Sequence, residues 1–412
     1  MPYVTALRCV FCDGVFPARL IHTCPRCGIT GILDVLYDYP AIAGRLTRRT
    51  LAARRDLSHW RYRELLPIRA TSSVPDLAVG WTPLTQAPAL GRYIGLPHLL
   101  VKDDGRNPSG SLKDRASSVG VVKAREAGRP VIACASTGNA ASSCAGMAAS
   151  LGLQSVIFVP ERAPEPKVTQ LLIFGATVFR VRGSYEDAFQ LCRQSCDARG
   201  WYNRNSGINP YLVEGKKTVG LEIAEQLAWQ PPDWVAVSVG DGCTIAGVWK
   251  AFRELKQIGI IAHTPRILGV QAEGSAPITE CFRTGADFQP LEPRTIADSI
   301  AVGVPRNWKK AIDAVRESGG TMINVADEEI LDAMRYTGRL AGIFAEPAAA
   351  TAIAGLRRAA AEGAVSRSQS AVAIVTGNGL KDIRSAKCAV GEPIDIAPDG
   401  AGLEDLCQAA HC

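Results

Sequence analysis

Short apolar runs alternate with glycine-rich turns and with segments of helical periodicity along most of the chain beyond Trp81. This alternation is typical of βα units, in which helices connect the strands of a parallel sheet. Buried strands are expected where the apolar runs are densest, at residues 131–135, 155–159, 177–181, 234–239, 267–271 and 371–375. Helices are expected between the strands, for example over residues 218–229 and 328–340. The pattern therefore predicts an α/β fold with mainly parallel sheets.

The length of the chain favours two α/β lobes with a cleft between them over one large sheet. The 412 residues, of which 47% are hydrophobic and 21% charged, supply enough apolar material for two cores. A net charge of only +6, spread along the chain, makes nucleic acid an unexpected partner. No apolar run of about 18 residues predicts a membrane span, and the first residues lack the features of a secretory signal. We therefore expect a cytoplasmic protein.

Two pairs of cysteines stand within residues 1–40. Cys9 and Cys12 form one CxxC pair, and Cys24 and Cys27 form a second pair, eleven residues further on. Two such pairs are typical of a zinc ribbon, in which four thiolates surround one metal ion and stabilise a segment too short for its own core. A four-thiolate site has no open coordination position, so any zinc is expected to be structural. A decayed site that folds without metal is the alternative.

Polar loops follow three of the predicted strands. Residues 136–140 precede a helix of small residues, residues 240–247 open another helix, and residues 376–379 follow the last predicted strand. Ligands of open parallel sheets bind at the carboxyl ends of the strands, and a helix N-terminus favours an anion. The loop at 240–247 lacks the downstream acid of a dinucleotide-binding fingerprint, so a nicotinamide dinucleotide is a weak competitor. Each loop alone is also consistent with a helix cap or a polar turn.

A lysine, Lys113, stands at a predicted helix start behind a turn of Pro, Gly and Ser. Nearby cations and the positive end of a helix lower the pKa of a lysine and make it a nucleophile toward aldehydes. Most lysines are instead solvated surface residues. The three anion-ready loops favour a reactive Lys113 over that alternative. The five histidines lie in no catalytic-looking motif, which disfavours histidine-based triads.

Ordered motifs along nearly the whole chain carry a family resemblance. Beside the two CxxC pairs they are Trp60-Arg-Tyr-Arg-Glu-Leu-Leu66, Gly80-Trp-Thr-Pro-Leu84, Asn107-Pro-Ser-Gly-Ser-Leu-Lys-Asp-Arg115, Ser136-Thr-Gly-Asn139 and the segments at 209–218, 271–274, 346–349 and 376–382. Together they resemble pyridoxal-phosphate enzymes of the tryptophan-synthase-β fold type, and most closely the threonine synthases. The resemblance implies a two-lobed fold type II architecture with bound pyridoxal 5'-phosphate, preceded by the zinc-ribbon-like segment.

The resemblance also implies roles toward the cofactor. Lys113 would bind the cofactor aldehyde covalently and then move protons at the substrate Cα and Cβ. Asn139 would bond the 3-hydroxyl of the cofactor, and Thr376 would face its pyridine nitrogen. The cofactor phosphate would be held by the loop that contains Gly240, Asp241, Gly242, Cys243 and Thr244.

The same resemblance implies a phosphorylated amino-acid substrate, O-phospho-L-homoserine, which loses phosphate and takes up water to give threonine. The substrate carboxylate would be bound by Ser136, Thr137 and Ala140. The substrate phosphate would be bound by Ser184, Asn205 and Arg115. The resemblance further implies a homodimer.

Several positions depart from the family pattern and keep alternatives open. Asp241 and Cys243 stand where an asparagine and a glycine are usual, Asn378 stands where a histidine is usual, and residues 298–307 lack an expected Gly-Asn-Pro turn. These changes favour, as an alternative, β-elimination or β-replacement, as in serine/threonine dehydratases or in the synthase that makes cysteate from O-phosphoserine and sulfite. A non-catalytic scaffold is a further alternative, which the intact Lys113, Asn139 and Thr376 disfavour.

The matched motifs divide the chain into a series of predicted parts. The zinc-ribbon-like segment spans residues 1–40 and a helical linker spans 41–79. A large cofactor-binding lobe is expected from residues 80–125 together with 215–400. A small mobile lobe is expected over 126–214, and a C-terminal tail over 401–412.

Overall fold

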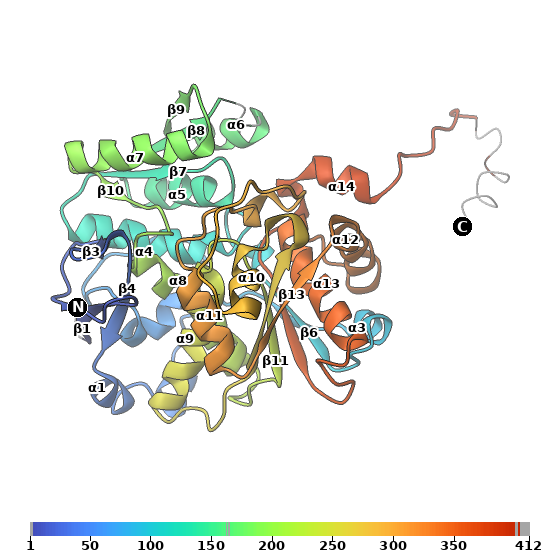
Figure 1. Cartoon of the computed structure of the whole chain (residues 1–412), viewed down its shortest axis with the longest axis horizontal. Coiled ribbons are helices and arrows are strands. Elements are labelled where there is room, and N and C mark those ends of the chain that lie inside the picture. The colour runs from blue at the N-terminus through green and yellow to red at the C-terminus, as the bar shows by residue number, and fades with distance from the viewer. Residues whose placement is uncertain (1–2, 162, 164, 400–402, 404–412) are drawn as a thin grey trace.

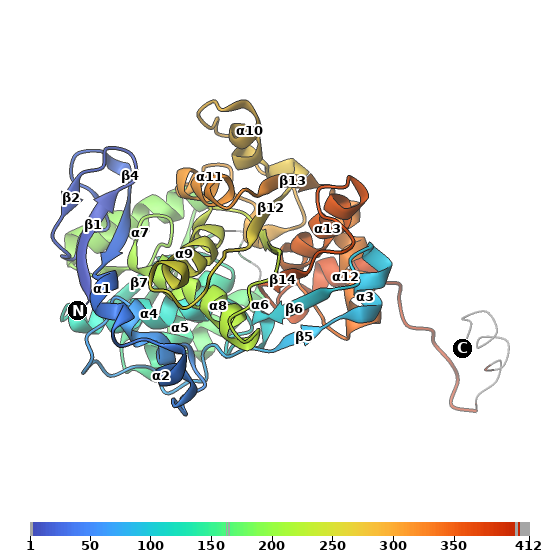
Figure 2. The same cartoon turned by 90° about the horizontal axis from the view of Figure 1, so that it is seen from below.

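The computed structural model describes residues 3–161, 163, 165–399 and 403. Its first part is a four-stranded antiparallel sheet with the strand order β2-β1-β4-β3 (Figures 1 and 2). The strands of this N-terminal sheet are β1 (Val4–Cys9), β2 (Val15–Phe16), β3 (Thr23–Cys24) and β4 (Gly28–Tyr37). The C-terminal tail that the sequence predicts over 401–412 lies outside the described residues, apart from residue 403.

A second sheet contains four parallel strands in the order β10-β7-β8-β9. Consecutive residues of β7 belong to two different hydrophobic clusters. Ile132 packs with α5, and Ala133 packs with α7. Because neighbouring strand residues point to opposite faces, α5 and α7 cover opposite faces of this sheet. The strands and their helices are β7 (Val131–Ala135), α5 (Asn139–Ser150), β8 (Gln154–Pro160), α6 (Glu165–Ile173), β9 (Thr177–Val181), α7 (Tyr185–Arg199) and β10 (Tyr202–Asn203).

A third sheet has six strands in the order β13-β12-β11-β14-β6-β5, and all pairs are parallel except β5 with β6. Its two faces are covered in the same way, since Val235 packs with α9 and Ala236 packs with α13. The strands are β5 (Leu84–Gln86), β6 (Leu99–Asp103), β11 (Trp234–Ser238), β12 (Arg266–Ala272), β13 (Thr321–Val325) and β14 (Ala371–Val375). The two mainly parallel sheets confirm the predicted two-lobed α/β class.

The remaining helices connect the strands or lie before them. None of the helices among the described residues is both long enough and apolar enough to cross a membrane. They are α1 (Tyr39–Ala43), α2 (Arg48–Ala52), α3 (Pro88–Ile94), α4 (Lys113–Glu126), α8 (Tyr211–Gln226), α9 (Cys243–Gln257), α10 (Pro277–Thr284), α11 (Trp308–Glu317), α12 (Asp327–Ala341), α13 (Pro347–Ala361) and α14 (Ile383–Ala389). Five 3₁₀ turns accompany them: η1 (His59–Leu65), η2 (Asp104–Arg106), η3 (Glu273–Ser275), η4 (Asp298–Ile300) and η5 (Gly379–Lys381).

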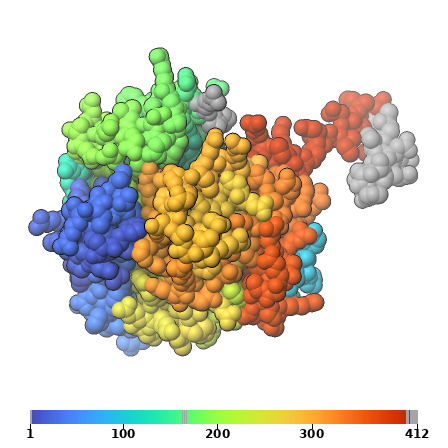
Figure 3. Space-filling view, viewed as in Figure 1, coloured from blue at the N-terminus to red at the C-terminus, as the bar shows by residue number. Residues whose placement is uncertain are grey.

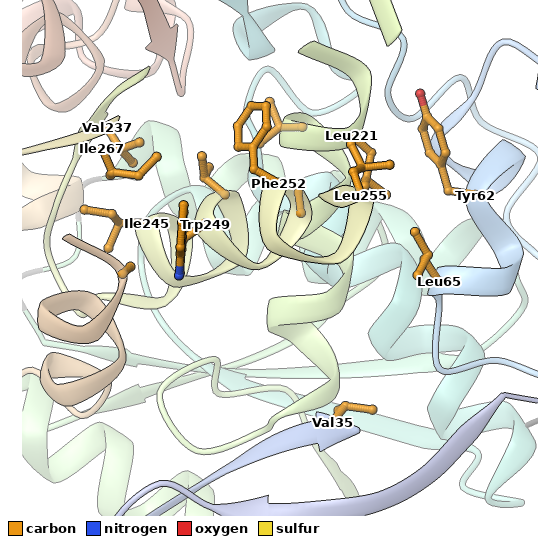
Figure 4. Packing of buried hydrophobic residues seen from close by; sticks show 14 of the residues in the cluster. Val35, Tyr62, Leu65, Leu221, Val237, Ile245, Trp249, Phe252, Leu255 and Ile267 are labelled. Carbon is orange, nitrogen blue, oxygen red and sulfur yellow. The ribbon is translucent and has the colours of Figure 1, made fainter. Parts of the chain in front are cut away.

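The largest core joins the N-terminal sheet to the six-stranded sheet through α8 and α9 (Figure 4). Figure 4 shows Phe252 of α9 between the strand residues Val237 and Ile267 on one side and Leu221 of α8 with Leu255 of α9 on the other. The same cluster includes buried residues of β1, β4 and η1. The N-terminal segment is therefore stabilised by burying its apolar face against the main body.

The predicted strands agree closely with the structure because buried parallel strands are dense apolar runs. The helix predicted over 218–229 is wrong at its start, since α8 begins seven residues earlier, at Tyr211. The first turns of α8 carry Glu214, Lys216 and Lys217, all of them buried. These charged residues face other protein groups instead of water, so no apolar periodicity marks the beginning of the helix.

Candidate active site

The carboxyl ends of β7, β11 and β14 open onto one cavity of about 1170 Å³. The three polar loops predicted from the sequence therefore meet at a single site, as expected for ligands of parallel sheets. The predicted site residues that line the cavity are Lys113, Ser136, Thr137, Asn139, Ala140, Asn205, Gly240, Asp241, Gly242, Cys243, Thr244 and Thr376.

Lys113 is the first residue of α4, and backbone pairing with the loop after β14 fixes its position. The amide of Leu112 donates to the carbonyl of Thr376 over 2.9 Å. Burial, and then the charge of the nearby Lys216, lower the pKa of Lys113 to about 8. A sizeable fraction of Lys113 is therefore a neutral, nucleophilic amine at pH values near 8.

Asn139 begins α5 and is held by a buried carboxylate, Glu346, which directly precedes α13. Its Nδ2 donates to Glu346 Oε1 over 2.8 Å and to Oε2 over 3.0 Å. Burial raises the pKa of Glu346, although Asn139 and Lys113 oppose the rise. The amide of Asn139 is thus oriented by Glu346, a residue whose motif was noticed in the sequence but was given no role.

The loop after β11 is shaped to hold an anion. Gly242 has a left-handed backbone (φ +89°), precedes the first turn of α9 and offers no side-chain cap. The first amides of a helix lack partners within the helix and favour an anion. A Cβ atom at Gly240 would lie only 2.9 Å from the Cα of Ile300. The two glycines therefore let the backbone amides line the cavity in a space that side chains would fill.

The acidic residue of this loop is hydrogen-bonded to neighbouring protein groups. Asp241 Oδ1 accepts a hydrogen bond from the amide of Arg306 over 2.6 Å, and Oδ2 accepts from the thiol of Cys243 over 3.3 Å. The two loop positions that depart from the family pattern thus bond to each other. Both carboxylate oxygens of Asp241 therefore accept hydrogen bonds from protein groups.

These features fit pyridoxal 5'-phosphate. The cavity combines an amine of lowered pKa, an anion-binding loop and polar groups at the strand ends. The hydroxyl of Ser238, at the end of β11, is buried in the cavity wall and has no hydrogen-bond partner among the described residues. An unpaired buried hydroxyl is costly unless a ligand completes its bonding.

Two predicted substrate residues do not line this cavity. Ser184 is exposed and caps α7, where its hydroxyl accepts from the amide of Asp187 over 3.2 Å. Arg115 is fully buried behind Lys113 and forms ion pairs with Asp104 and Glu222. Both side chains therefore bind protein groups in this structure. The hydroxyl of Ser184 caps a helix, and the guanidinium of Arg115 pairs with two buried carboxylates.

Two buried cations of the cavity, Lys216 and Arg204, were missed in the sequence. Lys216 belongs to a motif that carried the family resemblance, but without a role. That motif was the only signal for Lys216 in the sequence. The burial of the α8 residues around it is seen only in the structure. The approach of both cations to the cavity depends on how α8 and β10 pack, which local sequence does not encode.

Both parallel sheets contribute to the walls of the cavity. In Figure 3 the green surface of the four-stranded sheet meets the yellow-to-orange surface of residues around 300. Lys167 of α6 pairs with Asp298 over 2.7 Å, and Glu186 of α7 pairs with Arg306 over 3.2 Å across this boundary. All four side chains line the cavity. The bound ligand is therefore expected to contact both sheets.

Comparison with known proteins agrees with this site. Residues 75–377 match the family described as pyridoxal-phosphate dependent enzyme. The chain is 41% identical over 396 residues to the threonine synthase of Methanocaldococcus jannaschii, covering 95% of this chain and 96% of that relative. It is 41% identical over 392 residues to the threonine synthase of Methanosarcina acetivorans, covering 94% of this chain and 95% of the relative.

Solved structures of more distant proteins share the fold. Threonine deaminase isoform 2 from Solanum lycopersicum superposes with a TM-score of 0.65 at 24% identity, covering 75% of this chain and 87% of that one. Diaminopropionate ammonia lyase from Escherichia coli superposes with a TM-score of 0.66 at 19% identity, covering 84% and 92%. Fold and site together define a pyridoxal-phosphate-dependent lyase of fold type II. Within that class the chain belongs to the threonine synthase family, which confirms the resemblance found in the sequence.

If Lys113 is the residue that binds the cofactor aldehyde, capture of pyridoxal 5'-phosphate by the apoprotein is expected to accelerate with pH and to level off above pH 8, because only a neutral amine attacks an aldehyde and the pKa of Lys113 is about 8. Below that pKa, each pH unit changes the neutral fraction about tenfold. Stopped-flow absorbance of the bound cofactor measures the rate. In Lys216→Met the plateau is expected at higher pH, since Lys216 lowers the pKa of Lys113. A rate independent of pH in both proteins would contradict the assignment of Lys113.

Proposed function

We propose that the chain is a threonine synthase that converts O-phospho-L-homoserine and water to L-threonine and phosphate. The observation that carries this proposal is the 41% identity to a threonine synthase over 95% of the chain. The cavity supports it, because an amine of lowered pKa, an anion-binding loop and a second group of polar loops face one space. A phosphorylated amino acid needs such a combination of sites.

Residues of the three loops are proposed to hold the cofactor. Lys113 would bind it covalently, the loop at 240–244 would hold its phosphate, and Asn139 and Thr376 would contact its ring. When bound, pyridoxal 5'-phosphate supplies an electron sink for negative charge at the substrate Cα. The amine of Lys113 would take protons from Cα and Cβ of the substrate and return them, since its lowered pKa lets it exchange protons near neutral pH.

The substrate carboxylate is proposed to bind at the start of α5. Ser136, Thr137 and Ala140 line the cavity there, and the first turn of α5 has no side-chain cap. Its free amides favour a carboxylate. Asn205 is proposed to lie near the substrate phosphate, although its Oδ1 already accepts from the amide of Ala135 over 2.9 Å.

The reaction is tested by incubating the cofactor-loaded protein with O-phospho-L-homoserine while the product is identified by mass spectrometry and phosphate release is followed. We expect threonine and phosphate in equal amounts. Loaded protein that releases neither would overturn the proposal. Reaction with O-phosphoserine, serine or threonine, with or without sulfite, would then favour the β-elimination or β-replacement alternative, which Asp241, Cys243 and Asn378 keep open.

We also propose that the four N-terminal cysteines hold a structural zinc ion. The Sγ atoms of Cys9, Cys12, Cys24 and Cys27 all lie within 4.8 Å of one another. The separations Cys9–Cys27 of 4.0 Å and Cys12–Cys24 of 3.7 Å are close to the edge, roughly 3.8 Å, of a tetrahedron with Zn–S bonds of about 2.3 Å. The donor set and its spacing therefore fit zinc.

Purified protein is expected to contain one equivalent of zinc, and Cys24→Ser is expected to lose it and to melt several degrees lower. The loss follows because the N-terminal sheet packs into the largest core, so that metal binding contributes to folding. Elemental analysis and thermal denaturation measure both effects. Cys388→Ser, which changes an exposed cysteine far along the chain, serves as the control. Metal-free wild-type protein with an unchanged melting temperature after chelation would contradict the zinc proposal.

The cytoplasmic location and the homodimer expected from the sequence are kept as proposals. Both proposals follow from the family resemblance. Analytical ultracentrifugation of the loaded protein would report a mass near twice 43.9 kDa if the chain forms a homodimer.

A further inference from the structure

Lys216 lies where three helices meet at the cavity. Gly215 brings α8 against the start of α4, because a Cβ atom there would lie 1.9 Å from the carbonyl oxygen of Arg115. Gly247 brings the first turns of α9 against the same part of α8, since its Cβ would lie 3.3 Å from the carbonyl carbon of Lys216. Lys216 is thereby held between Lys113, which begins α4, and the anion-binding loop that begins α9.

The positive charge of Lys216 is buried without a direct ion pair. The residue is 2% exposed, and it forms no ion pair with any residue that the structure describes. Other buried lysines nearby are paired: Lys217 with Glu214 over 2.6 Å, and Lys102 with Glu222 over 2.8 Å. A buried, unpaired cation is costly. The contrast with the paired lysines therefore indicates that Lys216 binds an anionic ligand.

The groups around Lys216 identify the side of the cavity on which that anion lies. Burial lowers the pKa of Lys216 and Arg204 lowers it further, whereas Cys243 and Asp241 raise it. Cys243 and Asp241 both belong to the loop at 240–244. Asp241 accepts hydrogen bonds from the amide of Arg306 and the thiol of Cys243, and it forms no ion pair with Lys216. The unpaired positive charge of Lys216 therefore faces the loop at 240–244.

We propose that Lys216 is the cationic partner of the cofactor phosphate. The proposal rests on the cofactor site and not on the identity of the amino-acid substrate. The amides of the loop and the start of α9 supply partial charges, and Lys216 supplies one full charge to the same dianion. Arg204 is a second buried cation, but its guanidinium already donates to the hydroxyls of Ser117 and Ser206 over 2.9–3.0 Å. Lys216 contacts the thiol of Cys243, and its ammonium group keeps further donors for the phosphate.

The test compares pyridoxal 5'-phosphate with pyridoxal, which lacks the phosphate. In Lys216→Met the dissociation constant for pyridoxal 5'-phosphate is expected to rise about 10- to 100-fold, the usual effect of losing a charge-assisted hydrogen bond. At a pH above the capture plateau of both proteins, where Lys113 is neutral in each, the dissociation constant for pyridoxal is expected to change less than about threefold. Lys216→Arg is expected to restore most of the affinity for the phosphorylated form. Lys256→Met, which changes an exposed lysine near the end of α9, is the matched control.

Two further measurements are independent of activity. The ³¹P resonance of the bound cofactor is expected to titrate at higher pH in Lys216→Met, because a nearby cation stabilises the dianion and lowers the pKa of the phosphate. The apoprotein of Lys216→Met is expected to melt no lower than wild-type apoprotein, since the substitution removes an unpaired buried charge. Its gain in melting temperature on adding pyridoxal 5'-phosphate is expected to be smaller.

Equal losses of affinity for pyridoxal and pyridoxal 5'-phosphate would overturn the proposal, since Lys216 would then act on the ring or through Lys113. Unchanged cofactor affinity with a raised KM for the phosphorylated substrate would also overturn it, and would assign Lys216 to the substrate phosphate. Both outcomes leave the proposed reaction intact. A protein that forms no threonine yet shows the phosphate-specific loss would instead refute the proposed reaction and retain Lys216 as the phosphate partner.

Discussion

Substitution of Lys113 by alanine is expected to lower the rate of threonine formation by at least about 10³-fold, the usual contribution of a positioned proton-transfer group together with a covalent one. Among the described residues that line the cavity, Lys113 is the only lysine that is the first residue of a helix. Lys216 is close, but its charge is directed to the anion-binding loop. The yellow absorbance of covalently bound cofactor is expected to disappear, whereas the phosphate loop should still hold the cofactor without a covalent bond. Spectra and product assays on the same samples measure both effects.

Lys256→Ala is the control for this prediction, because it removes an exposed amine without touching the cavity. Its spectrum and its rate are expected to equal those of the wild type. If Lys113→Ala kept the absorbance of covalently bound cofactor, another amine would be the attachment point, and Lys216 would be the first to examine. If it kept the rate, the role given to Lys113 in moving protons would be refuted.

The parts of the fold that could be predicted from the sequence are those in which local composition and tertiary environment agree. The strands at 131–135 and 371–375 lie at the predicted positions because both of their faces are buried, which requires a run of apolar residues. The strand at 99–103 was not predicted, although it is central to pairing with β14. Lys102 and Asp103 of this strand are charged, as residues of polar turns often are. Lys102 is tolerated inside the strand because it forms an ion pair with the buried Glu222.

The candidate site shows the same division. Loops that follow strands could be located from the sequence, because the carboxyl ends of all strands in a parallel sheet lie at the same edge. Side chains that reach the cavity from the middle of a helix, such as Lys216, could not be located. Their positions depend on close helix contacts at Gly215 and Gly247, which connect segments that are distant in the chain. Ser184 and Arg115 illustrate the opposite error, since both were predicted to bind substrate and neither lines the cavity. A shared motif predicts the residue type at a position but not the groups that surround it.

Replacement of Glu222 by glutamine is expected to destabilise the protein by about 3–5 kcal/mol, the cost of leaving buried charges unpaired. Glu222 is fully buried and pairs with Lys102 over 2.8 Å, while its other oxygen pairs with Arg115. Arg115 also pairs with Asp104 over 2.6 Å. These four side chains balance two positive charges against two negative ones. Neutralising Glu222 leaves one positive charge uncompensated in the interior, directly behind Lys113. Urea denaturation of the apoprotein at neutral pH measures the loss.

The pH dependence of stability separates this structural role from a role in substrate binding. Burial alone would raise the pKa of Glu222, but Arg115 and Lys102 hold it far below its ordinary value of 4.5. A depressed pKa contributes stability above about pH 4.5 that is lost as the pH falls, so the difference between wild type and Glu222→Gln should shrink in acid. Glu317→Gln, which changes a half-exposed partner of Arg253, should cost less than about 0.5 kcal/mol. If Glu222→Gln kept full stability but raised the KM for O-phospho-L-homoserine, Arg115 would be a substrate-binding residue after all.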